Sequence, residues 1–209
     1  AQAMQKPQIW SISGRDKGQF LFEVPGRKPV LPSALELREK NNPYRGLQSY
    51  REQDAALFFG RDADIAALQQ RLATCCALVI CGASGSGKSS LVRGGLLPQL
   101  VADRKQRWRV LTCKLPGPDT DSLFRKWAAE LVTGCISLPL AIEQHRAQHP
   151  DIRLCLLVDP LEELVPLGSS MASFERGLSE VLHAGGSSVC VLMTLRSDAE
   201  PRFHGLLTA

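Results

Sequence analysis

The segment from Gly82 to Ser89, GASGSGKS, constrains the fold of this chain more than any other part of the sequence. It matches the pattern G-x-x-x-x-G-K-[ST], in which glycines let the backbone curl around a phosphate so that successive N–H groups point at it. An apolar run of strand length, Cys76 to Cys81, precedes this loop, and Ser90 to Leu100 follows it with apolar residues at helical spacing. Strand, loop and helix therefore occur in the order that a phosphate-binding loop requires.

The motif gives its polar side chains distinct roles. Lys88 would reach the β and γ phosphates of a nucleotide, and the Ser89 hydroxyl would ligate Mg²⁺. The predicted nucleotide-binding positions are the whole loop and the next residue: Gly82, Ala83, Ser84, Gly85, Ser86, Gly87, Lys88, Ser89 and Ser90. The alternative is a Gly/Ser loop that binds no ligand.

A second apolar run, RLCLLV, ends in Asp159 and continues as PLEEL. A hydrophobic strand that ends in a carboxylate is the Walker B arrangement, in which the Asp holds Mg²⁺ through water beside the phosphate-binding loop. Ser89 and Asp159 are thus the predicted metal ligands. Glu162 or Glu163 would polarise the attacking water, and we favour Glu162. The alternative is a pair of solvated glutamates at a helix start, where the helix dipole favours them.

Strand-like and helix-like segments alternate along the chain. Strands are predicted also at Trp108 to Leu115 and Val189 to Leu195, and helices at 62–72, 122–132, 142–148 and 174–183. The alternation predicts an α/β fold, a three-layer sandwich with a parallel sheet and right-handed crossovers. One strand lies between the loop strand and the Walker B strand in sequence, as in the additional-strand P-loop ATPases. The N-x-K-D guanine signature is impossible with asparagine only at positions 41 and 42, so ATP is favoured over GTP.

The first 40 residues are predicted to lie outside the nucleotide-binding core. Gln8 to Ser13 and Gln19 to Val24 are β-prone runs separated by GRDKG, which predicts a β-hairpin arm followed by a linker. We therefore expect two regions, 1–40 as arm and linker and 41–209 as the nucleotide-binding core. The core is expected to stop before any helical lid or winged-helix module.

Several motifs taken together resemble a known class. PYRGL (43–47) and FFGR (58–61), followed by GxSGSGKSSLVRGGLLPxL and D-x-x-E-E, resemble the bacterial STAND class of signal-transduction P-loop NTPases. The run usually continues D-Q-F-E-E-L, whereas Pro160 and Leu161 stand here; Pro removes a backbone donor and fixes φ, which can redirect both glutamates. The resemblance implies ATP or ADP with Mg²⁺, weak ATPase activity, and a switch that assembles with other copies of itself.

The resemblance also assigns residues outside the loop. It implies a base pocket lined by part of the lead-in segment, with Gly60 and Arg61 approaching the nucleotide and Arg196 sensing the γ-phosphate. The implied pocket residues are Tyr44, Arg45, Leu47 and Phe59. Capping of the sheet edge by the aromatic residues, and a surface or helix-capping role for Arg196, are the alternatives.

The N-terminal arm resembles the closing strands of bacterial caspase-like peptidase domains through a Q-x-P-x-x-S-x-x-G-x-F-x-F pattern. This likeness implies an upstream effector domain, whereas an arm packed on the core is the plainer interpretation. A signalling or defence switch is the favoured function. A non-hydrolysing nucleotide-binding scaffold and a small-molecule kinase remain open, although no Arg-rich lid segment follows the Walker B run.

Composition excludes some classes of partner. No apolar run reaches membrane-spanning length and no signal-peptide pattern opens the chain, so a cytoplasmic location without membrane contact is expected. Residues 1–114 carry a net +9 and residues 115–209 a net −5, but the densest basic cluster, 103–109, is expected in a turn, and nucleic-acid binding is disfavoured. His145 and His149 are expected on a solvated helix face, and the strand cysteines as small buried side chains.

Overall fold

A parallel β-sheet forms the centre of the molecule. The computed structural model describes residues 8–11, 45–46, 48–113, 120–164 and 171–203. The sheet has the order β1-β2-β5-β4-β3, and each neighbouring pair is parallel. The strands are β1 (Gln8–Ser11), β2 (Ala77–Gly82), β3 (Arg107–Cys113), β4 (Ile152–Val158) and β5 (Val189–Arg196). The α/β class with a parallel sheet is confirmed.

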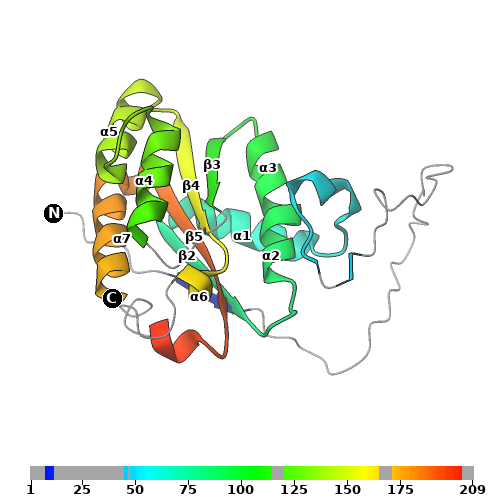
Figure 1. Ribbon diagram of the computed structural model, residues 1–209. Helices are drawn as coiled ribbons and strands as arrows, with labels where there is room; N and C mark the ends of the chain where they lie inside the picture. Colours follow the sequence, from blue (N-terminus) through cyan, green and yellow to red (C-terminus); the bar gives the residue numbers. More distant parts are fainter. Residues whose placement is uncertain (1–7, 12–44, 47, 114–119, 165–170, 204–209) are drawn as a thin grey trace.

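Helices cover both faces of the sheet (Figure 1). One layer consists of α4 (Thr120–Leu131), α5 (Leu138–Gln148) and α7 (Met171–Gly185). The other contains α1 (Asp62–Thr74) and one helical stretch made of α2 (Lys88–Ser90), the π-helical η3 (Leu91–Leu96) and α3 (Leu97–Ala102). Short helical segments complete the described structure: η2 (Glu52–Leu57), α6 (Leu161–Leu164), η4 (Gly186–Ser188) and η5 (Glu200–Phe203).

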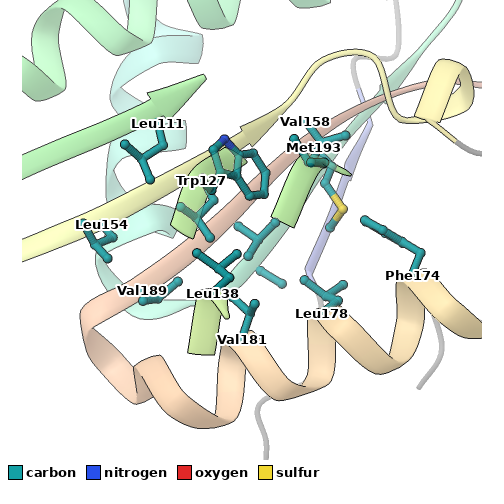
Figure 2. Close-up of a cluster of buried hydrophobic side chains, with 14 of the residues drawn as sticks. Leu111, Trp127, Leu138, Leu154, Val158, Phe174, Leu178, Val181, Val189 and Met193 are labelled. Carbon is teal, nitrogen blue, oxygen red and sulfur yellow. The ribbon is translucent and has the colours of Figure 1, made fainter. Parts of the chain in front are cut away.

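Two separate hydrophobic clusters form because successive strand residues point to opposite faces of a sheet. In β4, Leu156 belongs to the cluster under α4, α5 and α7, and its neighbour Leu157 belongs to the cluster under α1 and α3. Figure 2 shows the first cluster, in which Trp127 of α4 and Phe174 of α7 lie over strand residues such as Met193. Because β2, β4 and β5 are buried on both faces over most of their length, they are nearly continuous apolar runs in the sequence.

The register of the sheet brings the predicted functional segments to one edge. Gly82 pairs with Arg196 and Val158 with Met193, so the ends of β2, β4 and β5 lie side by side. The phosphate-binding loop follows β2 and Asp159 follows β4. Strand β5 lies between β2 and β4, so the Walker B strand and the loop strand are not neighbours.

Helix α5 buries one residue that is predicted to face solvent. The prediction of a solvated face for His145 is wrong: the residue is only 3% exposed because this side of α5 packs into the first cluster, while His149 is exposed. Residues of the predicted N-terminal hairpin are described only at β1, which pairs in parallel with β2 from Gln8↔Leu78 to Ser11↔Cys81. Its second strand lies outside the described residues, so the hairpin stays a prediction.

Over the described ranges, no helix is both long and apolar enough to cross a membrane.

Candidate functional site

The loop after β2 has the backbone that its glycines predict. Gly85 and Gly87 adopt φ values of 75° and 81°, in the left-handed region that only glycine enters without strain. Gly87 then caps the start of α2, so the loop leads directly into a helix N-terminus. Ser86 Oγ is buried and has no hydrogen-bond partner among the described residues, as expected for a group that serves a ligand.

Lys88 lies inside this loop. Its side chain is buried, and Nζ donates hydrogen bonds to the carbonyl oxygens of Gly82 and Ala83, at 2.8 and 2.9 Å. Carbonyl oxygens carry no formal charge, so these two bonds leave the positive charge of the buried ammonium group available to an anionic ligand. The side chain therefore supplies the mobile cation that the motif predicts for binding phosphates.

Asp159 accepts hydrogen bonds from three different elements. Its Oδ1 lies 2.7 Å from Ser89 Oγ of α2 and 2.5 Å from Thr194 Oγ1 of β5. Its Oδ2 accepts a 2.6 Å bond from Arg93 Nε of η3. The structure thus brings the two predicted metal ligands, Ser89 and Asp159, into contact at the carboxyl edge of the sheet.

The lead-in segment before α1 packs on the helix that follows the loop. The backbone N–H of Tyr50 donates to Ser90 Oγ at 3.1 Å, and the Tyr50 and Phe58 rings meet edge to face with centroids 5.6 Å apart. A Cβ added at Gly94 would lie 2.7 Å from Tyr50 Cβ, and one at Gly95 would lie 2.8 Å from Phe58 Cε1. The two glycines thus let the lead-in segment approach the helix closely.

Two adjoining hollows open at this edge. The first, of about 280 Å³, lies between the loop and the lead-in segment and is lined by Gly46, Gln48, Ser49, Gly85, Gly87, Lys88, Ser89 and Ser90. The second, of about 640 Å³, opens beside Asp159 and is lined by Ser49, Arg51, Glu52, Gln53, Ser89, Arg93, Thr112, Lys126, Asp159 and Pro160. Ser49 and Ser89 line both, so the lead-in segment borders the loop and the Walker B end of the sheet alike.

The predicted catalytic residues lie beyond Asp159. Glu162 is half-buried and its Oε2 accepts a 3.3 Å bond from the backbone N–H of Arg196, whereas Glu163 is exposed. The Arg196 guanidinium binds Asp198 through Nε and one terminal nitrogen, at 3.0 and 2.7 Å. These bonds hold the pKa of Asp198 below its usual value and raise that of Arg196. Burial and the Glu200 carboxylate raise the pKa of Cys81, the residue before the loop, to about 11.

The lead-in residues implied by the resemblance are not all brought to the loop. Phe59 is 77% exposed. Arg45 forms an ion pair with Asp54, and Arg61 forms one with Asp64 at the start of α1. Gly60 adopts a φ of 82° in the turn before α1. Tyr44 and Leu47 lie outside the described residues.

The chain that carries this loop, Lys88, Ser89 and the strand-end Asp159 matches a known protein family. A model of the family described as novel STAND NTPase 1 matches residues 43–208. The chain belongs to this STAND NTPase family. No curated protein and no solved structure gives a match. The family supports a nucleotide-binding P-loop NTPase module, usually with Mg²⁺, over the region that contains the loop, Asp159 and Arg196.

Sequence reasoning missed two residues that donate hydrogen bonds to Asp159. Arg93 was not singled out, although it follows Ser89 by four residues and therefore shares its helix face. Thr194 was not singled out either, although it is the polar residue in the otherwise apolar run VCVLMTL. Within the described ranges, no group of three or more His, Cys, Asp or Glu side chains could hold a metal.

Proposed function

We propose that this STAND NTPase binds Mg²⁺ with ATP or ADP in the hollow between its loop and its lead-in segment. One observation supports this proposal above the others. Lys88, Ser89 and Asp159 lie together at the carboxyl ends of the strands, with Ser89 Oγ 2.7 Å from Asp159 Oδ1. The Ser86 hydroxyl, which has no hydrogen-bond partner among the described residues, and the positive φ of Gly85 and Gly87 fit a phosphate chain against the loop.

Each group of the site has a part in holding the ligand. The loop N–H groups from Gly82 to Ser90 and the Lys88 ammonium would bind the phosphates. Ser89 and Asp159 would hold Mg²⁺, which neutralises charge on the β and γ phosphates. Gly46, Gln48 and Ser49 line the same hollow, which supports a base pocket built by the lead-in segment. Following the resemblance, we propose that Tyr44, Arg45, Leu47 and Phe59 contribute to the base pocket when a nucleotide is bound, with Gly60 and Arg61 near the nucleotide.

We further propose slow hydrolysis of ATP. Glu162, fixed by the Arg196 N–H, would orient and polarise the attacking water, and Glu163 is the less favoured candidate. Arg196 would contact the γ-phosphate after exchanging its bonds with Asp198. Turnover should be on the order of 10⁻⁴ to 10⁻² s⁻¹, the range of switch NTPases without an activating partner.

The wider role that we propose is that of an additional-strand ATPase core in a signalling or defence protein. The position of β5 between β2 and β4 supports the additional-strand type. Such a core would act in the cytoplasm, report its nucleotide state to an effector domain, and assemble with other copies of itself.

Lys88→Ala tests the nucleotide site. Binding of ADP with Mg²⁺, measured by calorimetry, should weaken by at least about a hundredfold, because charged hydrogen bonds to phosphate contribute about 1.5–3 kcal/mol each and Lys88 makes more than one. The exposed Lys105, in the turn before β3, provides the control Lys105→Ala. Undiminished affinity in Lys88→Ala would refute the site, whereas binding without phosphate release from ATP would favour the scaffold function.

A further inference from the structure

Arg93 connects the Walker B end of the sheet to the lead-in segment. Its Nε donates to Asp159 Oδ2 at 2.6 Å, and a terminal nitrogen lies 3.5 Å from Glu52 Oε1 in η2. The Arg93 side chain is 13% exposed and that of Asp159 only 3%, whereas Glu52 is 45% exposed. The largely buried guanidinium of Arg93 therefore lies between two carboxylates, the buried one of Asp159 and the more exposed one of Glu52.

The bonds to Asp159 satisfy both of its oxygens from within the protein. Ser89 and Thr194 donate to Oδ1, and Arg93 to Oδ2. A carboxylate this deeply buried is costly unless a cation pairs with it, and Arg93 provides that charge. A divalent cation held by Ser89 and Asp159 would lie within a few ångströms of the guanidinium, where the two like charges repel each other.

We propose that Arg93 is a positioning residue that neutralises Asp159 when no metal is bound and thereby opposes Mg²⁺ binding. This inference rests on the proposed function, since it takes Asp159 to be a metal-binding carboxylate. Coupling between two binding events is reciprocal, so Mg²⁺ weakens the hold of Arg93 on Asp159 to the same extent. Because Arg93 also faces Glu52, metal loading is transmitted to η2 and the lead-in segment.

The test compares ADP affinity with Mg²⁺ and with EDTA, by calorimetry, in the parent chain and in Arg93→Met. Methionine keeps an apolar stem of similar length and removes the charge. The enhancement of affinity by Mg²⁺ should be about tenfold larger in Arg93→Met than in the parent, a usual size for coupling between two sites. Arg93→Lys, which keeps the charge, should stay near the parent, and Arg104→Met is the exposed-arginine control. An enhancement that is unchanged or smaller in Arg93→Met overturns the proposal.

A separate variant tests the link between Arg93 and the lead-in segment. Without the Glu52 carboxylate, the full charge of Arg93 acts on Asp159, so Glu52→Gln should reduce the Mg²⁺ enhancement by about twofold, as expected for a partly exposed pair. The same substitution in the Arg93→Met background should have no effect. A reduction that persists without Arg93 would show that Glu52 acts by another route and would overturn the link.

A third measurement does not depend on nucleotide. In EDTA, urea unfolding of Arg93→Met, Asp159→Asn and the double variant forms a double-mutant cycle. Arg93→Met should destabilise the parent clearly and the Asp159→Asn protein much less; additive effects would overturn the pairing. If the parent binds no nucleotide while the cycle shows coupling, the proposed function fails and the Arg93–Asp159 interaction stands. If Arg93→Met does not fold, Arg93→Gln replaces it in each arm.

Discussion

Asp159 accepts hydrogen bonds from side chains on three separate elements. Ser89 comes from α2, Arg93 from η3 and Thr194 from β5. The phosphate-loop motif and the strand-end position identify Ser89 and Asp159 from local sequence alone. The other two contacts arise because the strand order brings β5 between β2 and β4 and because the helix after the loop turns Arg93 toward β4.

The two glutamates after Pro160 allow a matched comparison. We predict that Glu162→Gln lowers the single-turnover rate of phosphate release from ATP by about a hundredfold or more, the lower range for loss of a general base. Mg·ATP binding should persist, because the bond from the Arg196 N–H can be accepted by the Gln carbonyl oxygen. Glu163→Gln, on the exposed neighbour, should keep the parent rate. Equal rates in both variants would remove Glu162 from the mechanism.

At the scale of elements, the lead-in segment packs closely on η3. Gly94 and Gly95 lie in a π-helical turn, where an ordinary side chain would collide with Tyr50 and Phe58. Glycine inside a helix is unfavourable unless packing requires it, and the close approach of the lead-in segment gives the Gly-Gly pair in VRGGLL such a reason. Tyr50 and Phe58 are distant from these glycines in the sequence, and only the fold identifies them as the packing partners.

Gly94→Ala should therefore destabilise the protein despite the higher helix propensity of alanine. The added Cβ would lie 2.7 Å from Tyr50 Cβ, an atom fixed close to the backbone, so the lead-in segment must shift. We expect a loss of about 1–3 kcal/mol in the free energy of urea unfolding, as for overpacked cores. Weaker ADP binding should accompany it, because Gly46, Gln48 and Ser49 line the hollow.

Val101→Ala provides the control for this substitution. Val101 lies on α3 and is 66% exposed, so the change should alter stability by no more than about 0.5 kcal/mol. If Gly94→Ala proves as stable as the parent, the lead-in segment does not pack on η3 as described.

For the molecule as a whole, the sheet separates two hydrophobic clusters, and the cluster under α4, α5 and α7 encloses a titratable side chain. His145 is 3% exposed, and its Nε2 has no hydrogen-bond partner among the described residues. Burial, followed by the positive charges of Arg109 and His149, lowers the pKa of His145 below its usual 6.5. The unfolded chain therefore binds a proton at a higher pH than the folded chain.

This difference predicts a pH dependence of stability. Well above pH 6.5 His145 is neutral in both states and has no effect; as pH falls through 6.5 the unfolded state gains a proton first, and stability is lost by at most about 1.4 kcal/mol per pH unit. His145→Leu should therefore lose less urea-unfolding free energy than the parent between pH 7.5 and pH 5.5. The exposed His183 on α7 supplies the control His183→Leu, which should retain the parent difference. An unaltered pH dependence in His145→Leu would exclude this origin.

The features determined by sequence alone are those that depend on near neighbours. The order of strands and helices follows from apolar periodicity, and the loop from glycines that permit positive φ at positions 85 and 87. The parallel sheet follows because each strand is separated from the next by a helix. Local sequence also predicts roles for Lys88, Ser89 and Asp159, since each predicted role is tied to a fixed place in a motif or at a strand end.

Tertiary structure decided what depends on distant pairings. The burial of His145 requires the packing of α5 in the first cluster, and periodicity alone leaves open which side of so weakly amphipathic a helix faces inward. The local sequence does not distinguish Arg93 from a surface arginine. It pairs with Asp159, 66 residues away in the sequence, because β4 ends beside η3. Such contacts follow from strand order and register, which are set by the packing of the whole core, and no short stretch of sequence encodes them.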